Sequence, residues 1–247
     1  MQKKENTLPA CQTVYGKNGE ILLKGEWDSK KLCNAVTMGN PNYWKGRTVL
    51  DLGSNTGGLS LELARMGAIV TAAEPDPYKN NKAHSIEILK KITQEENLNL
   101  VFSDEHLFNA HLLGKHDIIL CLGLIYHFRD PQYVLDYLSG LDHNDLIVSV
   151  QTYPGDGLFM YNRKDISVIN IPNFWEKHTD ALSGWHPTRK LFIAMLQSAG
   201  YTNIQALTDD KINFPKKPEG LTNSAYYKAV KQKSINANES RKIFYPR

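Results

Sequence analysis

The chain has 247 residues, which is enough to bury the core of one α/β domain or of two small ones. Its 29 Lys and Arg against 26 Asp and Glu give a net charge of +3, so the chain as a whole lacks the strong positive field of proteins that bind nucleic acid by charge alone. Three widely spaced cysteines form no metal or redox motif, and the sequence shows neither a signal peptide nor an apolar run long enough to cross a bilayer, so we expect a cytoplasmic protein without a membrane partner.

Residues 1–45 are expected to form a leading segment ahead of the main domain. Residues 16–19 are typical of a turn, residues 20–23 of a short strand, and Asp28 of the N-cap of a helix that runs to about residue 38. The segment could cover the mouth of a ligand site, or its aromatic residues could instead pack against the edge of a sheet. These aromatic residues are Trp27, Tyr43 and Trp44.

An aliphatic run that ends at an acid, passes through a glycine-rich turn and resumes with helical spacing covers residues 49–65. This pattern predicts a strand, a tight loop and a helix. Gly53 would let the chain leave the strand, while Gly57 and Gly58 would allow close approach to the helix start. Asp51 would repel a pyrophosphate but suits a cationic group, such as the ammonium and sulfonium of S-adenosylmethionine (SAM). A glycine-rich turn of an unrelated α/β domain is the alternative.

The same stretch resembles motif I of the class I SAM-dependent methyltransferases, usually D-x-G-x-G-x-G, with Asn55 at the position of the middle glycine. The resemblance implies a SAM site in this loop. Its expected residues are Asp51, Gly53, Ser54, Asn55 and Gly57.

Acids also follow the next two predicted strands. Glu74 comes after the strand 68–73 and 23 residues after Asp51, a position that suits hydrogen bonds from the two ribose hydroxyls of a nucleoside. After the strand 98–102 comes Asp104, which the family resemblance assigns to the adenine amino group. Asp104 could equally cap the next short helix.

A fourth strand is predicted over residues 116–122, and the backbone of Gly123 and Leu124 after it is expected to contact the cofactor. Parallel strands bind ligands outside their carboxyl ends, so the residues that end these four strands should line one crevice. They are Asp51, Glu74, Asp104 and Gly123.

The remaining pattern completes an α/β fold. Helices are expected over residues 131–138 and 188–199, the second opened by Pro187, and strands over 146–150, 202–207 and 224–230. With the resemblance, this predicts a Rossmann-like class I methyltransferase fold, a mostly parallel seven-stranded sheet with an antiparallel last hairpin. The domain would cover residues 46–233, with residues 151–186 as an inserted substrate cap and residues 234–247 as a basic tail.

His127 lies just beyond the fourth predicted strand, where an acceptor should approach the methyl group. A histidine near neutral pKa is a suitable base for removing the proton of a hydroxyl acceptor, and Tyr126 beside it is the second candidate catalytic residue. His127 could instead be a helix-start histidine bonded to backbone. The sequence shows no cluster at metal-ligand spacing, so no metal is expected.

The expected cap combines aromatic and basic side chains, which suit a polar, anionic small-molecule acceptor. The candidate acceptor-binding residues are Tyr153, Arg163, Trp185, His186 and Arg189. Alternatively, Trp185 and Arg189 only pack against and cap the following helix.

Residues 123–131 and 184–189 also resemble the enzymes that complete 5-oxyacetic acid on the wobble uridine of tRNA. The chain lacks the basic C-terminal motif by which those enzymes hold a carboxylated cofactor, so ordinary SAM is the expected donor. The first hypothesis is O-methylation of a small polar, sugar-like or anionic metabolite. A tRNA-modifying enzyme and a non-catalytic SAM-binding module are the alternatives.

Overall fold

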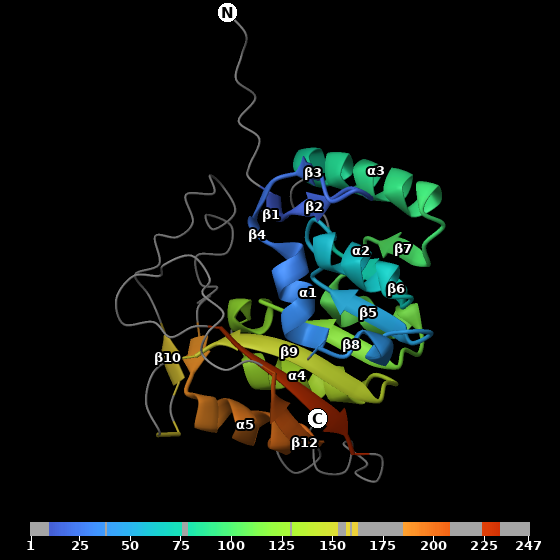
Figure 1. The fold of residues 1–247 in the computed structure, drawn as a ribbon. Coiled ribbons are helices and arrows are strands. Elements are labelled where there is room, and N and C mark those ends of the chain that lie inside the picture. The colour runs from blue at the N-terminus through green and yellow to red at the C-terminus, as the bar shows by residue number, and fades with distance from the viewer. Residues whose placement is uncertain are drawn as a thin grey trace, which may run out of the picture. The chain divides into compact units, whose positions relative to one another are not determined.

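The computed structural model describes residues 10–37, 39–75, 79–128, 130–152, 157–158, 160–162, 185–207 and 224–232. Tyr153, Arg163 and the predicted tail 234–247 lie outside the described residues. The chain divides into two compact units, Met1–Ile119 and Leu120–Arg247, coloured blue to green and green to red in Figure 1.

Seven strands form one sheet in the order β12-β13-β9-β8-β5-β6-β7. Its strands β5, β6 and β7 are parallel neighbours, whereas β12, β13 and β9 are antiparallel neighbours. The predicted seven-stranded sheet with an antiparallel last hairpin is therefore confirmed. Among the described residues, no helix combines the length and apolar character needed to cross a membrane.

The core of unit 1 is built on β5 (Thr48–Leu52), β6 (Ile69–Ala73) and β7 (Leu100–Ser103), joined by the helices α2 (Gly58–Arg65) and α3 (Lys79–Glu95). The strands are short aliphatic runs, and burying them on both faces favours parallel pairing. The register aligns the carboxyl ends of β5 and β6, and the fully buried side chains of this core come from both strands and helices. They include Val49, Leu50, Leu52, Leu59, Leu61, Leu63 and Val70.

The leading segment folds onto unit 1 as two small strand pairs. β1 (Ala10–Gln12) runs parallel to β4 (Gly25–Trp27), and β2 (Val14–Tyr15) pairs antiparallel with β3 (Ile21–Leu23). The strand expected over residues 20–23 is thus confirmed, while β1, β2 and β4 were not predicted.

The helix α1 (Ser29–Thr37) begins where the sequence predicts it. Asp28 Oδ1 accepts hydrogen bonds from the backbone N–H groups of Lys30 and Lys31 at 3.0 and 3.2 Å, as expected of an N-cap. Trp44, which follows the short 3₁₀ helix η1 (Pro41–Tyr43), has no exposed surface, so the packing role is the correct one for this residue.

Unit 1 ends with the 3₁₀ helix η2 (Leu107–Leu113) and the start of β8 (Ile118–Cys121). Asp117 fixes this start, because its Oδ2 accepts from both the backbone N–H and the hydroxyl of Thr48 at 2.9 Å. These bonds also lower the pKa of the Asp117 carboxyl. The strand predicted over residues 116–122 is therefore present but shorter, covering Ile118–Cys121.

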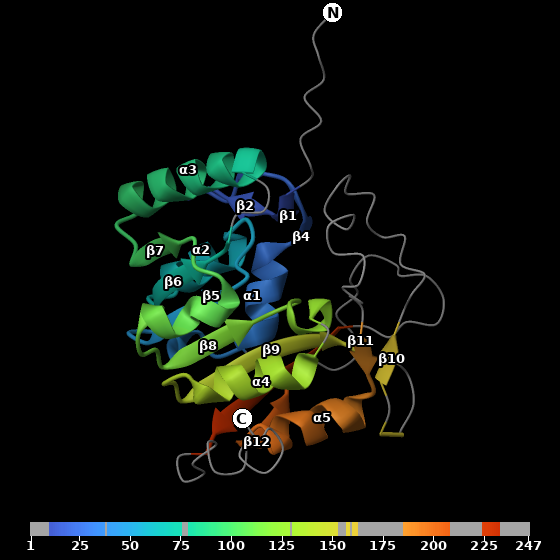
Figure 2. The same ribbon diagram turned by 180° about the vertical axis from the view of Figure 1, so that it is seen from behind.

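Unit 2 packs α4 (Pro131–Gly140) and α5 (Arg189–Ser198) beside each other, as both ribbon views show (Figure 2). Gln132 Nε2 on α4 donates to the carbonyl oxygen of Met195 on α5 at 3.2 Å. The strands of this unit are β9 (Asp145–Gln151), β12 (Tyr201–Ala206) and β13 (Ser224–Lys231).

Two details of unit 2 correct the sequence-based predictions. Pro187 does not open α5; it ends β11 (Trp185–Pro187), and Thr188 is the N-cap, accepting from the backbone N–H of Leu191 at 3.1 Å. β11 pairs antiparallel with β10 (Met160–Asn162), which lies within the stretch predicted to be irregular. Three-residue strands more than twenty residues apart give no periodic signal.

Candidate active site

The loop after β5 takes three left-handed backbone conformations, with φ of 72° at Gly53, 52° at Asn55 and 71° at Gly57. The N–H groups of Gly53 and Ser54 both donate to the carbonyl oxygen of Ala73, at 2.9 and 3.2 Å, so the loop is tied to the end of β6. Asparagine is among the few residues other than glycine that tolerate this conformation. Asn55 therefore adopts the backbone conformation that a glycine would take at that position.

Glu74 directly follows β6 and is held against this loop. Its Oε2 accepts a hydrogen bond from the backbone N–H of Asn55 at 2.9 Å, and its own N–H donates to Ser103 at the end of β7. The structure thus brings together Glu74 and the predicted cofactor loop. The contact to the backbone of Asn55 was not predicted.

Asp51 is buried at the carboxyl end of β5, where it is only 3% exposed. Burial raises the pKa of its carboxyl to about 6; a 2.5 Å hydrogen bond from the Ser60 hydroxyl opposes this rise, and the negative charge of Glu74 adds to it. Two carboxylates therefore repel each other at the end of neighbouring strands. A positively charged ligand would relieve this repulsion.

The first strand of the chain closes over the same loop. The N–H of Gln12 donates to Thr56 Oγ1 and its carbonyl oxygen accepts from that hydroxyl, both at 3.0 Å. The Gln12 side chain accepts from the N–H of Leu59 at 2.8 Å, in the first turn of α2. Gly57, the N-cap of α2, has no side chain to do so. The absence of a capping side chain at Gly57 is the one sequence signal that a distant residue must accept a hydrogen bond from the first turn of α2.

Replacing Gln12 with alanine is expected to lower the free energy of unfolding by about 1–3 kcal/mol, because a buried N–H at Leu59 loses its acceptor. Urea unfolding followed by circular dichroism measures the change. The control is Gln94→Ala, an exposed glutamine on α3, which should change stability by no more than about 0.5 kcal/mol. Equal stability of the two variants would contradict the capping role of Gln12.

Asp104 directly follows β7 and is exposed. The next helix, η2, has His106 as its N-cap, whose Nδ1 accepts from the N–H of Phe108 at 3.3 Å. The alternative role of Asp104 as the cap of this helix is therefore wrong. Its assignment to the adenine amino group stays a prediction.

In unit 2, Gly123 follows β8 with φ of 68°, and its N–H donates to Ser149 Oγ at 2.8 Å. Leu124 is the N-cap of the 3₁₀ helix η3 (Ile125–His127), so this short helix places both candidate catalytic residues. The rings of Tyr126 and His127 are 4.4 Å apart between centroids and tilted by 47°.

His127 is exposed to solvent, yet enough protein surrounds its ring to affect its protonation. Desolvation lowers the pKa of His127 to about 4, against a hydrogen bond with the backbone of Gly123 that raises it. The alternative prediction of a hydrogen bond between His127 and the backbone is therefore confirmed, and this bond uses one of the two ring nitrogens. The imidazole is neutral at pH 7 and can accept a proton.

The predicted acceptor-binding residues are only partly described. His186 is buried and stacks on Tyr126, with centroids 6.1 Å apart and planes 18° from parallel, so direct contact with a ligand would require this packing to open. The backbone of Trp185 lies in β11, and Arg189 is the first residue of α5. Arg189 lies near Tyr227, where its charge opposes the rise in the pKa of Tyr227 that burial causes.

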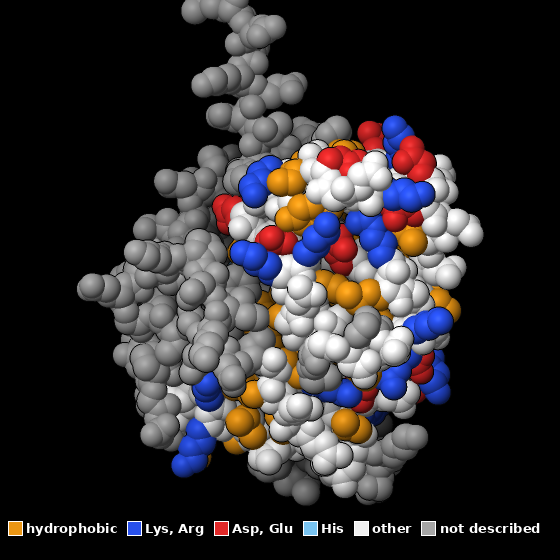
Figure 3. Space-filling view, in the orientation of Figure 1, with side chains coloured by type: hydrophobic (Ala, Val, Ile, Leu, Met, Phe, Trp, Pro, Cys, Tyr) orange, Lys and Arg blue, Asp and Glu red, His pale blue; other side chains and the backbone are white. Residues whose placement is uncertain are grey.

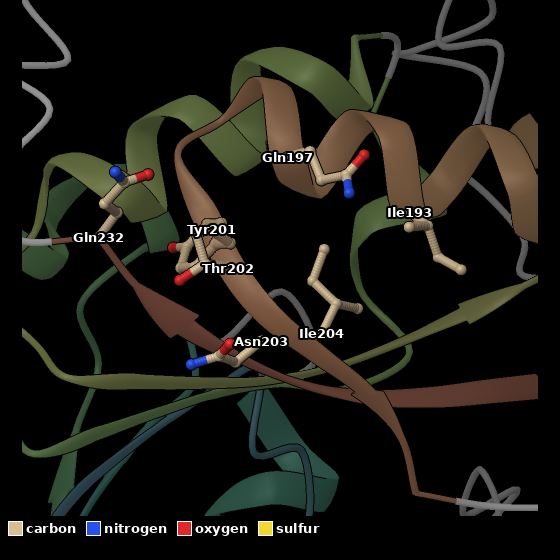
Figure 4. A pocket seen from close by; sticks show the side chains of 7 residues that line it. All are labelled: Ile193, Gln197, Tyr201, Thr202, Asn203, Ile204 and Gln232. Atoms are coloured by element: carbon tan, nitrogen blue, oxygen red, sulfur yellow. The ribbon is translucent and has the colours of Figure 1, made fainter.

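A hollow of about 440 Å³ lies elsewhere in unit 2, between α5 and β12 (Figure 4). It is at the end of the sheet where β9 begins, since Tyr201 pairs with Lys231 and Val230 pairs with Asp145. It is therefore remote from the end of β8, and none of the candidate site residues lines it. The lining residues are Ile193, Gln197, Tyr201, Thr202, Asn203, Ile204 and Gln232.

A family model described as a methyltransferase domain matches residues 38–206, more than half of the chain. The chain belongs to the class I SAM-dependent methyltransferases. The methyltransferase is 30% identical over 146 residues to the ubiquinone biosynthesis O-methyltransferase of Shewanella sp. (strain ANA-3), which covers 55% of the chain and 58% of the relative. It is 33% identical over 121 residues to the enzyme of the same name from Escherichia coli O7:K1 (strain IAI39 / ExPEC), covering 46% and 47%. The chain thus spans about half the length of these curated relatives.

Solved structures support the fold of the methyltransferase. The N-terminal domain of EvdMO1, determined in the presence of SAH and D-fucose, aligns with a TM-score of 0.59 at 18% identity, covering 89% of the chain and 90% of that domain. The magnesium protoporphyrin IX methyltransferase of Synechocystis PCC 6803 with bound SAH aligns with a TM-score of 0.53 at 19% identity, covering 83% and 82%. The Rossmann-like class I fold is confirmed.

SAM is the cofactor of this methyltransferase, and the residues present fit it. SAM carries positive charge on its sulfonium and ammonium groups. The mutual repulsion of Asp51 and Glu74, which helps to raise the pKa of Asp51, favours such a cation over a pyrophosphate.

Proposed function

We propose that this methyltransferase O-methylates a small polar metabolite, with His127 as the general base. The observation that carries the proposal is the state of His127: a neutral, solvent-accessible imidazole with one side of its ring bonded to Gly123. The O-methyltransferase names of the curated relatives support a hydroxyl acceptor.

The residues of unit 1 are proposed to bind the cofactor. Glu74 would accept hydrogen bonds from the ribose hydroxyls, while the carboxylate of Asp51 would favour the cationic end of the ligand. Gly53 and Gly57 would let the ligand approach the loop backbone. Bound SAM supplies a methyl group on a positively charged sulfur, which makes that carbon electrophilic.

The residues of unit 2 are proposed to prepare the acceptor. His127 would take the hydroxyl proton on the ring nitrogen that does not bond Gly123, which leaves the acceptor oxygen with a lone pair for attack. Tyr126 would hold the imidazole plane, because its own ring is packed between those of His127 and His186. The predicted binding of the acceptor by Tyr153, Arg163, Trp185 and Arg189 remains part of this proposal, and His186 would take part if its packing on Tyr126 opens.

One face of the described residues offers no basic patch that would support the tRNA alternative. On the face shown in Figure 3, the described basic and acidic side chains are interspersed, and no patch of one sign gathers there. Proteins that bind nucleic acid through phosphate contacts concentrate Lys and Arg on one face.

The test is a methylation screen with radiolabelled SAM. Purified protein is incubated with separate panels of sugars, hydroxy acids and catechols, and with bulk tRNA, and methylated products are identified by mass spectrometry. We expect an O-methylated product in a small-molecule panel. Label in tRNA, or SAM binding without turnover in every panel, would instead support the tRNA-modifying or the non-catalytic alternative.

A further inference from the structure

A chain of hydrogen bonds leads from the interior of unit 2 to His127. One ring nitrogen of His127 donates to the carbonyl oxygen of Gly123, the bond that works against desolvation of the ring. A neutral imidazole has a single N–H, so donating it to a fixed carbonyl determines which nitrogen keeps the lone pair. The position of the Gly123 carbonyl therefore decides which tautomer His127 adopts.

The backbone of Gly123 is held at its N–H by Ser149. The Gly123 N–H donates to Ser149 Oγ at 2.8 Å, and Gly123 has a left-handed φ of 68°. Ser149 is 3% exposed and lies in β9 between the fully or almost fully buried Val148 and Val150. A buried hydroxyl is costly unless its hydrogen bonds are satisfied, and the Gly123 N–H supplies one of them.

Tyr226 on β13 completes the chain. It is paired directly with Ser149 in the antiparallel register, which places both side chains on the same face of the sheet. The two hydroxyls share a hydrogen bond, and Tyr226 is 2% exposed. Burial raises the pKa of Tyr226, so it remains a neutral phenol.

We propose that Ser149 and Tyr226 are positioning residues that fix the tautomer of His127 through the backbone of Gly123. Neither hydroxyl needs to touch the acceptor or the cofactor. Their effect would be to keep the acceptor-facing nitrogen of His127 unprotonated and ready to take a proton. The value of this arrangement for catalysis depends on the proposed role of His127 as the base, but the positioning itself does not.

The test reads the tautomer directly and needs no substrate. Protein labelled with ¹⁵N-histidine is examined at pH 7 by long-range ¹H–¹⁵N NMR, which distinguishes the two neutral tautomers, and His127→Gln assigns the signal. Wild-type protein should show one tautomer at His127. In Ser149→Ala the ratio of the favoured neutral tautomer of His127 to the other should fall about five-fold or more. A change of this size corresponds to the net free energy of about one hydrogen bond. Ser149→Thr, which keeps the hydroxyl, should restore the wild-type spectrum.

Two controls separate positioning from a general loss of structure. Ser139→Ala removes another buried hydroxyl of unit 2, which donates to the carbonyl oxygen of Asp136, and should leave His127 unchanged. His143 is an internal reference, because its ring bonds Leu141 and Tyr201 instead. If Ser149→Ala does not fold, Tyr226→Phe retains the ring and should still reduce the tautomer ratio.

The proposal is overturned if folded Ser149→Ala and Tyr226→Phe both keep a single His127 tautomer, or if Ser139→Ala disturbs it equally. These results are independent of the methylation screen. An active His127→Ala variant would remove the general base and leave the positioning result intact.

Discussion

Replacing His127 with alanine is expected to lower kcat about 10²–10⁴-fold, the usual loss when a general base is removed. SAM affinity, measured by calorimetry, should stay within about two-fold, since the imidazole is assigned to the acceptor and not to the cofactor. The matched control is His111→Ala, an exposed histidine of η2 in unit 1, which should retain wild-type kcat.

The pH dependence gives this prediction a second measurement. The pKa of His127 is lowered to about 4 from an ordinary 6.5, so the ring binds a proton only in acid. Wild-type kcat should therefore be constant around neutral pH and fall as the pH drops through about 4, and His127→Ala should lose this acidic limb. EDTA should not affect the wild-type rate. Near-normal turnover of the variant, or full inhibition by EDTA, would refute the mechanism.

Glu74→Ala is expected to weaken SAM binding by about 5- to 150-fold, corresponding to the 1–3 kcal/mol lost when polar groups are left without a partner. The loss has two sources. One is the proposed bond to the ribose hydroxyls, and the other is the observed bond from the Asn55 N–H, which shapes the loop. Calorimetry with SAM measures the total.

A cofactor analogue that lacks the ribose 2′ hydroxyl separates the two sources. If Glu74 binds this hydroxyl, the analogue and Glu74→Ala should each weaken binding, and their combination should be less than additive. Fully additive losses would remove Glu74 from the ribose site while leaving its role in the loop. Glu105→Ala, another acid that follows β7, is the control and should bind SAM normally.

Local sequence signals predicted the parts of the site that lie close together along the chain. The loop after β5 and the acids after β6 and β7 each follow a strand end, and the parallel pairing of these three strands brings their ends to one edge of unit 1. The positive φ of Asn55 could also be expected, since asparagine takes the place of a glycine there.

The missed residues are those whose partners are distant in sequence. Gln12 bonds Leu59 across 47 residues, and Ser149 bonds Gly123 across 26. Each is an ordinary polar residue in a strand, and nothing local states which backbone group it will meet. Only the folded arrangement of strands decides these contacts, and the same holds for the pairing of β10 with β11.

Because β1 closes over the loop after β5, the pairing of β1 and ligand binding at the loop are coupled. Gln12 joins the strand to the loop through both its backbone and its side chain, so the loop and β1 stabilise each other. Such coupling is reciprocal: a ligand that favours the closed loop must shift the equilibrium of β1 toward its paired state by the same free energy with which that state favours the ligand. We therefore expect β1 to contribute to ligand affinity, and hydrogen exchange at its amides to slow when the loop is occupied.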